Sequence, residues 1–309
     1  SFHINSPTMN FKLTITVLSL LAVLNSGCSQ QPQQNTNFEE KPLVIMSQEN
    51  KETNHKANSA SEENLSKYKG DDAFTHSNRV GTTYKHQHYM LSYSEQDEQA
   101  EWLCYELTSA ECKGKLDRDG IFFEEDPAVK TISAHPYEYR DSGYDKGHLA
   151  PAGDMTFNSK ALQESFLMSN VSPQNNEFNS GVWNDLEKQV RVWAKRFGKV
   201  FVVTGPVLKI DGDKAKLRYY NKYRKKEYSN ITIPDAFYKV IFDFSKPSME
   251  KMIAFCIPTT APIDADIFDY VISVDELEKT TGIDFFNNLP VKVQSKYEIK
   301  SDVSLWKTR

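Results

Sequence analysis

The chain has 309 residues, of which 39% are hydrophobic, 12% are aromatic and 26% are charged. This composition is typical of a globular protein and excludes a disordered, collagen-like or disulfide-stapled chain. The formal net charge of −5 at pH 7 excludes a globally basic surface, so any nucleic acid must bind at a local site. The four cysteines, at positions 28, 104, 112 and 256, are too few and too unevenly spaced for a disulfide framework or a four-cysteine zinc site.

Residues 1–28 are predicted to be a targeting segment. Met9 is interpreted as the true start, because Lys12 and an apolar stretch over residues 13–24 follow it. This stretch is shorter than the roughly 20 apolar residues of a membrane-spanning helix. The residues up to Cys28 resemble a bacterial lipobox, although Asn25 stands where the pattern has a large aliphatic residue. We therefore expect a protein exported from a bacterial cell, either as a lipoprotein anchored through Cys28 at the periplasmic or cell surface, or secreted after ordinary signal-peptide cleavage.

The remainder of the chain divides into two parts. Residues 29–78 are rich in Gln, Asn, Glu, Lys and Ser and are predicted to form a disordered polar tether. Residues 79–309 have the size of a single mixed domain. Apolar runs in that domain predict strands at residues 102–107, 200–207, 237–244 and 252–257.

Two helices are predicted among these strands. Apolar residues at spacings of three and four over 183–197 indicate an amphipathic helix, which Gly198 ends. A second helix begins at Ser273, which forms a capping box with Glu276, and stops at Gly282. Short spacers between the later strands leave little room for parallel crossovers. The pattern therefore predicts an α+β fold with a largely antiparallel central sheet flanked by helices.

Polar residues that suit catalysis concentrate in residues 141–155. This segment holds a histidine, three acids, a lysine and three glycines within fifteen residues. His148 stands directly before a Leu-Ala-Pro segment that is expected to pack on the core. A lone histidine is ordinarily a satisfied core or surface residue, and His135, which precedes a proline, is given that interpretation.

A second polar group surrounds the start of the longer helix. At about 100° per residue, Asn179 falls in line with the apolar stripe, one turn before Trp183. An inward carboxamide needs a polar partner. Glu187 lies on the flank of the same stripe, about 80° around the helix. In the alternative interpretation, Asn179 is an N-cap and Glu187 faces solvent.

The order and spacing of these residues resemble a known family. The pattern comprises Asp145-Lys146-Gly147-His148, Asn170, Pro173-Gln174, Asn179-x-Gly181-x-Trp183 and Leu186-Glu187. It is similar to the DNA/RNA non-specific endonuclease family, which includes bacterial extracellular nucleases and mitochondrial endonuclease G. The similarity covers residues 85–300 and includes Arg118 in an Arg-x-x-x-Phe pattern.

The resemblance implies a ββα-metal nuclease fold and a role for each matching residue. His148 would be the general base, Asn179 the direct ligand of one Mg²⁺, and Glu187 an acid that holds metal-bound water. Arg118 would contact the phosphate and the transition state, and Asn170 would orient groups around His148. The family motif has arginine where this chain has Lys146, which keeps the charge for a phosphate contact but loses the bidentate fork. Asp145 would support the site, and Mn²⁺ is a plausible substitute for Mg²⁺.

The implied function is hydrolysis of phosphodiester bonds in DNA and RNA by water, leaving 5′-phosphates. Water as the nucleophile requires no 2′-hydroxyl, so the sugar need not matter. No obligate protein partner is predicted. The alternatives are a catalytically inactive nucleic-acid-binding homologue and a phosphodiesterase that acts on smaller phosphate esters.

Two features allow more than one interpretation. Residues 209–226 are basic and interleaved with tyrosines, which is typical of a nucleic-acid groove but also of a solvated hairpin. Cys104 and Cys112 are candidates for a disulfide across a hairpin, whereas Cys256 is expected to be a buried small hydrophobe.

Overall fold

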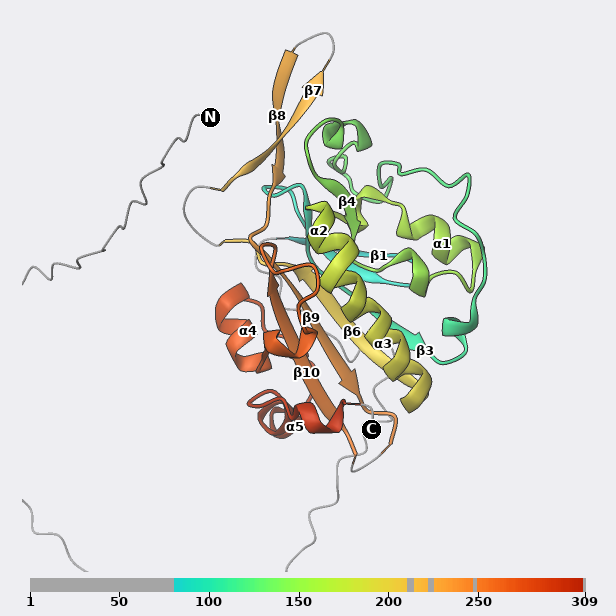
Figure 1. Ribbon diagram of the computed structural model, residues 1–309, viewed down its shortest axis with the longest axis vertical. Helices are drawn as coiled ribbons and strands as arrows, with labels where there is room; N and C mark the ends of the chain where they lie inside the picture. The colour runs from blue at the N-terminus through green and yellow to red at the C-terminus, as the bar shows by residue number, and fades with distance from the viewer. Residues whose placement is uncertain (1–80, 210–213, 222–224, 247–248, 308–309) are drawn as a thin grey trace, which may run out of the picture. The chain divides into compact units, whose positions relative to one another are not determined.

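A seven-stranded sheet forms the centre of the described chain (Figure 1). The computed structural model describes residues 81–209, 214–221, 225–246 and 249–307. The predicted targeting segment, Cys28 and the polar tether lie outside these residues. The strands follow the order β1-β2-β3-β6-β9-β10-β11, and each neighbouring pair is antiparallel. Their bounds are β1 Thr82–Lys85, β2 Met90–Ser94, β3 Gln99–Thr108, β6 Lys199–Pro206, β9 Ala236–Asp243, β10 Lys251–Pro258 and β11 Val271–Ile272.

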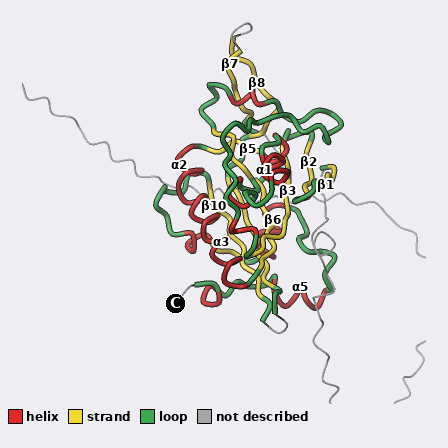
Figure 2. The backbone as a smooth tube through the Cα atoms, turned by 90° about the vertical axis from the view of Figure 1, so that its right-hand side faces the viewer, coloured by secondary structure: helices red, strands yellow, loops and turns green. Residues whose placement is uncertain are grey.

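The central strands are apolar on both faces because helices cover both sides of the sheet. Successive side chains of a strand point to opposite faces, so Val200 and Val202 of β6 enter one core while Phe201 and Val203 enter the other. Helix α3 (Asn184–Phe197) packs on the first face, and α4 (Val274–Thr281) and α5 (Val291–Tyr297) pack on the second. Figure 2 shows the sheet between these helical layers. The predicted α+β class with an antiparallel sheet is confirmed.

The remaining elements lie between β3 and β6 and carry the chemistry-bearing residues. β4 (Asp145–His148) and β5 (Val171–Gln174) pair with each other in a two-stranded antiparallel sheet, the β4–β5 hairpin. Helix α1 (Ser159–Ser165) and the 3₁₀ turns η5 (Ala152–Asp154) and η6 (Met168–Asn170) connect those two strands. After β5 come α2 (Asn176–Phe178) and a π-helical turn, η7 (Asn179–Trp183), which leads directly into α3.

The predicted strands and helices agree with the structure except at the start of the longer helix. Each predicted strand lies within three residues of β3, β6, β9 or β10 at both ends, and Ser273 caps α4 through the expected box with Glu276. Regular α-helix was expected through Asn179, but the π-helical turn contains a non-helical residue, Gly181. A Cβ on Gly181 would lie 2.6 Å from the carbonyl oxygen of Ile263, so this close approach requires glycine.

The basic segment forms a hairpin that projects from the sheet (Figure 1). Its strands are β7 (Lys216–Asn221) and β8 (Lys225–Thr232). Near its base, Lys214 pairs with Asp97 at 2.8 Å, and Lys216 donates to the carbonyl oxygen of Gln96 at 2.9 Å. These two lysines are therefore engaged within the protein, while residues 210–213 and 222–224 of the segment lie outside the described chain.

The cysteines in the described residues are not bonded to one another. None of Cys104, Cys112 and Cys256 forms a disulfide, so the predicted candidate bridge between Cys104 and Cys112 is absent from the described residues. Cys104 is buried, and Cys256 packs partly buried against the second core. Among the described helices, none is long and apolar enough to cross a membrane.

Candidate active site

The β4–β5 hairpin sets the directions of the residues in the Asp145–His148 motif. Because side chains alternate along a strand, Lys146 and His148 share one face and Asp145 and Gly147 share the other. The Gln174 side chain packs directly over Gly147, where an added Cβ would lie 2.2 Å from Gln174 Oε1. Glycine at position 147 therefore allows the two strands to pair while a buried glutamine crosses between them.

His148 presents a buried reactive nitrogen among aromatic rings. The ring centroids of Phe123 and Phe166 lie 5.2 and 5.1 Å from that of His148. Nε2 of His148 is buried and has no hydrogen-bond partner in the described part of the chain. Burial lowers the pKa of His148 from 6.5 to about 4, and the positive charge of Arg118 contributes to the shift. The imidazole is therefore neutral at pH 7 and can accept a proton.

Asn170 holds the chain that follows His148 in place. Its Oδ1 accepts a hydrogen bond from the Ala150 amide at 2.8 Å, and its Nδ2 donates to the carbonyl oxygens of Ala150 at 2.9 Å and Ser165 at 2.7 Å. Its backbone carbonyl accepts a further bond from the Leu149 amide. Asn170 is completely buried. The side chain thus joins the end of α1 to the segment after β4 and does not itself face a substrate.

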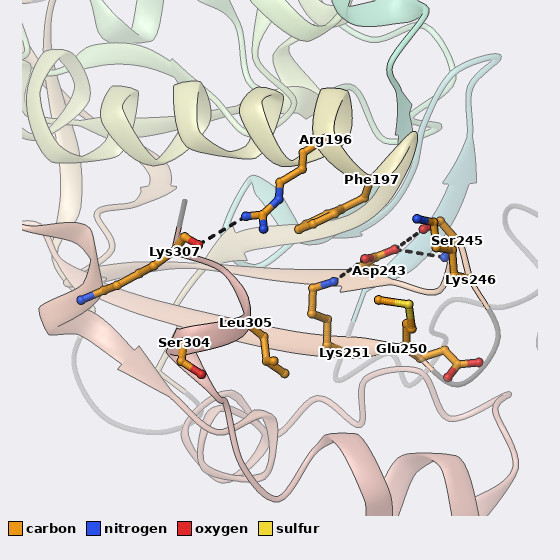
Figure 3. A pocket seen from close by; sticks show the side chains of 11 residues that line it. Arg196, Phe197, Asp243, Ser245, Lys246, Glu250, Lys251, Ser304, Leu305 and Lys307 are labelled. Carbon is orange, nitrogen blue, oxygen red and sulfur yellow. Dashed lines mark hydrogen bonds and ion pairs between the residues drawn. The ribbon is translucent and has the colours of Figure 1, made fainter. Parts of the chain in front are cut away.

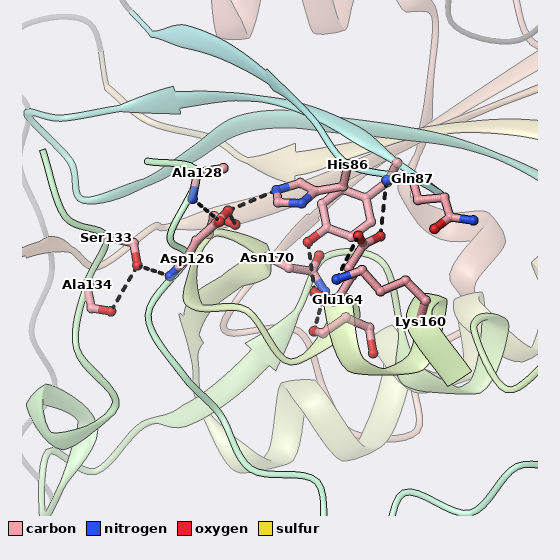
Figure 4. Close-up of polar contacts among 12 residues, drawn as sticks. His86, Gln87, Asp126, Ala128, Ser133, Ala134, Lys160, Glu164 and Asn170 are labelled. Atoms are coloured by element: carbon pink, nitrogen blue, oxygen red, sulfur yellow. Dashed lines mark hydrogen bonds and ion pairs between the residues drawn. The ribbon is translucent and has the colours of Figure 1, made fainter. Parts of the chain in front are cut away.

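A buried aspartate–histidine pair supports the same region from the other side (Figure 4). His86 Nε2 lies 2.9 Å from Asp126 Oδ2, and Ser169, next to Asn170, donates to the same oxygen at 2.5 Å. Burial raises the pKa of Asp126, but the hydrogen bonds from His86 and Ser169 outweigh it and leave the pKa below 3.8. The network anchors η6, and with it Asn170, to the turn between β1 and β2.

Asn179 lies in the π-helical turn and faces Asp145. Its Nδ2 donates to Asp145 Oδ2 at 3.0 Å, and Asn176 donates to the same oxygen at 3.0 Å. The expectation that Asn179 points into the apolar core is wrong: the side chain is only half-buried, because η7 winds more widely than an α-helix before α3 begins. It is not an N-cap either, since Asn175 caps α2. No hydrogen bond to Oδ1 is formed by the residues described, so that oxygen can serve as a metal ligand.

Glu187 is half-buried and belongs to a group of charges on the inner side of α3. Burial raises its pKa, while the positive charge of Lys239 on β9 opposes that change. Lys239 is 1% exposed; its Nζ lies 3.0 Å from Thr204 Oγ1, 3.5 Å from the Leu149 carbonyl oxygen and 4.6 Å from the centroid of the Trp183 ring. Lys239 therefore links the α3 acid to the backbone next to His148.

A strong ion pair completes this group of charges. Arg191 Nη1 lies 2.7 Å from Asp154 Oδ1, and the Tyr105 hydroxyl donates to Asp154 Oδ2 at 2.7 Å. Arg191 and Asp154 both contribute to the electrostatic environment of Glu187. With both oxygens of Asp154 occupied, Glu187 is the carboxylate of this group that can still bind water or a metal.

The structure brings the predicted residues together in two linked groups. One contains Arg118, His148 and Lys146, whose Nζ lies 5.3 Å from the centroid of Phe123. The other contains Asp145 and Asn179, while Glu187 connects to the His148 segment through Lys239.

Sequence analysis missed Phe123 and Lys239. Phe123 packs against the His148 ring and lies under the Lys146 ammonium, whereas the phenylalanine of the Arg118 pattern, Phe122, is 81% exposed. A lysine inside the apolar run 237–244 was a visible signal for a buried charge.

A separate pocket of about 650 Å³ contains none of these residues (Figure 3). It lies at the C-terminal end of α3, where Arg196 and Phe197 face the end of β9 and the C-terminal segment. Lys251 spans it, pairing with Asp243 at 2.5 Å and lying 3.8 Å from the centroid of Phe197. The 14-residue α3 helix separates this pocket from η7 and Asn179 by about 20 Å.

Comparison with known proteins identifies the family. The sequence model described as DNA/RNA non-specific endonuclease matches residues 69–292. Mitochondrial nuclease EXOG of Danio rerio is 36% identical over 205 residues, 64% of this chain and 59% of its own length. Human mitochondrial endonuclease G is 30% identical over 210 residues, 67% and 70% of the two chains. Nuclease C1 of Cunninghamella echinulata is 35% identical over 211 residues, 66% and 82% of the two chains. The chain thus spans somewhat more than half the length of the EXOG relatives.

The same fold is found in a solved structure. The crystal structure of the EndoG/EndoGI complex, in which EndoG is inhibited, matches with a TM-score of 0.59 and 26% identity. The match covers 72% of this chain and 90% of that chain. It supports the predicted ββα-metal nuclease architecture.

The comparisons overturn the predicted localisation. Nuclease EXOG and endonuclease G are named as mitochondrial proteins of animals, and this contradicts the expectation of a lipoprotein or secreted protein exported from a bacterial cell. That expectation depended on a short apolar stretch and an imperfect lipobox over residues 9–28, which report only local length and hydrophobicity. The family match, by contrast, extends over residues 69–292 and so rests on most of the chain. The chain belongs to the DNA/RNA non-specific endonuclease family.

Proposed function

We propose that this protein is a metal-dependent endonuclease that hydrolyses phosphodiester bonds of both DNA and RNA. The observation that carries the proposal is the buried, unpartnered Nε2 of His148, which lies within the electrostatic reach of the exposed Arg118. The names of the relatives, all nucleases, support it. The catalytic domain would comprise residues 79–309, with residues 29–78 as a polar tether.

His148 acts as the general base in this proposal. A phosphodiester is an anion that repels nucleophiles, so the attacking water must lose a proton as it reacts. With a pKa of about 4, His148 is unprotonated at pH 7 and Nε2 is ready to accept that proton. Asn170 positions the imidazole because it holds Leu149 and Ala150 directly after it.

Asn179 and Glu187 are the residues that would hold a metal ion. Asp145 binds the amide nitrogen of Asn179 and so directs its oxygen outward, as a hard ligand requires. Glu187 offers a carboxylate that Lys239 keeps at least partly ionised despite its burial. Mg²⁺ keeps most of its waters, so it would need only the amide oxygen of Asn179 as a direct ligand and the Glu187 carboxylate to hold a metal-bound water. Mn²⁺ could bind the same ligands. When bound, such an ion would supply positive charge to the phosphate oxygens in the transition state.

Arg118 and Lys146 provide positive charge from the chain itself. Arg118 is exposed beside His148 and can form paired hydrogen bonds to phosphate oxygens. Lys146 lies on the same face of β4 as His148, with its ammonium over the Phe123 ring at 5.3 Å and the Tyr139 ring at 5.9 Å. It provides a point charge where the family motif has the arginine fork.

The chemistry of the site explains a lack of preference between sugars. Water is the nucleophile, so no ribose hydroxyl takes part in the reaction. Charged side chains that contact phosphates add affinity without reading the base sequence. Attack by water on phosphorus with departure of the 3′ oxygen leaves 5′-phosphate products.

The proposal is tested by incubating the purified full chain with supercoiled plasmid and with single-stranded RNA, in Mg²⁺ or in EDTA. We expect both polymers to be cut in Mg²⁺ to products with 5′-phosphates, and neither to be cut in EDTA. Asn179→Ala should lower the rate at least tenfold at limiting Mg²⁺, whereas the exposed neighbour Ser180→Ala should not.

Two outcomes would point to the alternatives. Binding of DNA without cleavage by the folded wild-type protein, in Mg²⁺ and in Mn²⁺, would indicate an inactive homologue. Cleavage of small phosphodiesters but not of polymers would indicate a different substrate class.

A further inference from the structure

A cluster of three carboxylates lies on the opposite side of the sheet from α3. Asp275 and Glu278 stand three residues apart on one face of α4, and Glu298 follows α5. One carboxylate oxygen from each residue lies within 4.8 Å of the other two. The three acids come from segments separated by 20 residues or more in the sequence, so the fold assembles them.

Glu298 is the unusual member of this cluster. It is 5% exposed, and its Oε1 is buried without a hydrogen-bond partner in the described residues. Its backbone is fixed, because the Asp275 amide donates to the Glu298 carbonyl oxygen at 3.2 Å. Glu278 is also held, since its Oε1 accepts from the Phe285 amide at 2.8 Å. A buried acceptor that lacks a donor usually marks a missing water or ion.

The charges that shift the pKa of Glu298 are negative. Burial raises the pKa of Glu298 to about 8, and the negative charges of Glu278, Asp275 and Asp284 act in the same direction. Burial likewise raises the pKa of Glu278 to about 7, where Asp284 and Asp275 add to the effect and the Phe285 hydrogen bond opposes it. The folded chain therefore disfavours the three ionised carboxylates unless a positive charge joins them.

We propose that Asp275, Glu278 and Glu298 bind a divalent cation, with Ca²⁺ as the preferred ion. Carboxylate oxygens are ligands of hard cations, and Ca²⁺ holds them at about 2.3–2.6 Å, so oxygens on opposite sides of one ion are about 4.6–5.2 Å apart. The three carboxylate oxygens lie within 4.8 Å of one another, which is close enough for all of them to bind one Ca²⁺. Mg²⁺ fits less well, because it requires near-ideal octahedral geometry, whereas Ca²⁺ accepts flexible arrangements of carboxylates.

The bound ion would join the helices of the second layer. Val274 and Leu277 of α4 and Val293 of α5 pack in the core on this face, so the acids stand on a fixed framework. An ion between α4 and the end of α5 would add a cross-link to the Asp275–Glu298 backbone hydrogen bond and the core packing that already join these two segments. Its role is structural, because the cluster contains none of the residues assigned to phosphodiester hydrolysis.

The site is tested by titrating Ca²⁺ into the metal-free full chain by calorimetry, in the wild type and in the Asn179→Ala variant. We expect one saturable Ca²⁺ site with a Kd below about 1 mM in both proteins. Glu298→Gln and Asp275→Asn should each weaken binding at least tenfold. The matched control, Glu276→Gln, removes the same charge from an exposed position of α4 and should bind as the wild type does.

Three outcomes would overturn the inference. These are the absence of saturable Ca²⁺ binding by the wild type, equal binding by the Glu298→Gln variant, and loss of binding in Asn179→Ala. If the wild type ignores Ca²⁺ and Glu298→Gln melts at a higher temperature in EDTA, the cluster shares protons and binds no cation. Far-UV circular dichroism verifies folding, and the two cluster variants serve as independent tests should one misfold.

Discussion

His148 owes its reactivity to its surroundings more than to its residue type. The rings of Phe123 and Phe166 pack against the imidazole, burial lowers its pKa, and Arg118 adds a positive charge that opposes protonation. A histidine with an ordinary pKa of about 6.5 would be largely protonated in mildly acidic solution. In this site the base form persists to a much lower pH.

The pH dependence of cleavage follows from that shift. A general base works only when unprotonated, so kcat/KM should be lost as pH falls through the His148 pKa of about 4 and not near 6.5. Replacing Arg118 with Gln removes a positive charge, so the acidic limb of the profile should move to higher pH. The measurement is kcat/KM on a short duplex from about pH 4 to 8. The control is Arg140→Gln, which removes the charge of another exposed arginine and should leave the acidic limb where it is in the wild type. A wild-type acidic limb near pH 6.5 would contradict the assignment of His148 as a base with a lowered pKa.

Lys239 is expected to act as a positioning residue. It is buried near Glu187 and contacts the Leu149 carbonyl oxygen, so Lys239→Met should remove the largest of the positive charges that act on Glu187. We expect the apparent affinity for Mg²⁺ in cleavage assays to fall about 10–100-fold, as is usual for residues behind a metal ligand.

The half-exposed Lys199 pairs with Glu106 on the same sheet and provides the matched control, Lys199→Met. A uniform drop in the melting temperature of Lys239→Met, with unchanged Mg²⁺ dependence of its residual activity, would show that Lys239 is only structural.

At the residue level, the sequence pattern identified most of the candidate site but not the residues that position it. His148, Arg118, Asn179 and Glu187 could be selected because their types and spacing match a known motif. The direction of the Asn179 side chain could not be predicted, because a π-helical turn contains one residue more than a turn of regular α-helix. Phe123 and Lys239 come from distant segments, and only the folded chain shows that they meet the His148 region.

At the scale of elements, the β4–β5 hairpin and η7 form one hydrogen-bonded unit. Asn170 joins the hairpin to α1, Asp145 joins it to η7, and the His86–Asp126 pair anchors η6. Each of these contacts is a hydrogen bond to a buried or half-buried group. A unit built in this way can hold a general base and a metal ligand in fixed relation without a bound substrate.

The Asn170 side chain should therefore matter for both stability and rate. Asn170→Ala removes three hydrogen bonds and leaves the Ala150 amide and two carbonyl oxygens unpaired, which should lower the free energy of unfolding by about 2–4 kcal/mol. The folded fraction should also cleave more slowly, because the Asn170 side chain no longer holds Ala150 in the segment that follows His148.

Urea denaturation and initial rates measure these two effects. Asn158→Ala is the control, since Asn158 only caps α1 and its loss should cost about 1 kcal/mol with little change in rate. Equal stability and rates in the two variants would contradict the proposed role of Asn170.

At the scale of the whole molecule, the sheet separates two helical layers with different tasks. The α3 face carries Glu187 and leads into the hairpin, whereas the α4 and α5 face carries the carboxylate cluster. The antiparallel sheet and α3 were predictable because long apolar runs and helical periodicity are strong signals. The short elements β1, β11 and α5 were not predictable, because two to seven residues are too few for a periodic pattern and become ordered only by packing on the rest of the fold.

The central claim is that His148 is the base of a nuclease, and the rate of plasmid cleavage at pH 7 in Mg²⁺ by the His148→Ala variant tests it most directly. His135→Ala removes a histidine outside the site and is the matched control. We predict that His148→Ala cuts at least 10³-fold more slowly than wild type while retaining its fold and its affinity for DNA, in the range expected of a lost general base. His135→Ala should cut at the wild-type rate. Cleavage by folded His148→Ala within a few-fold of wild type would contradict the account.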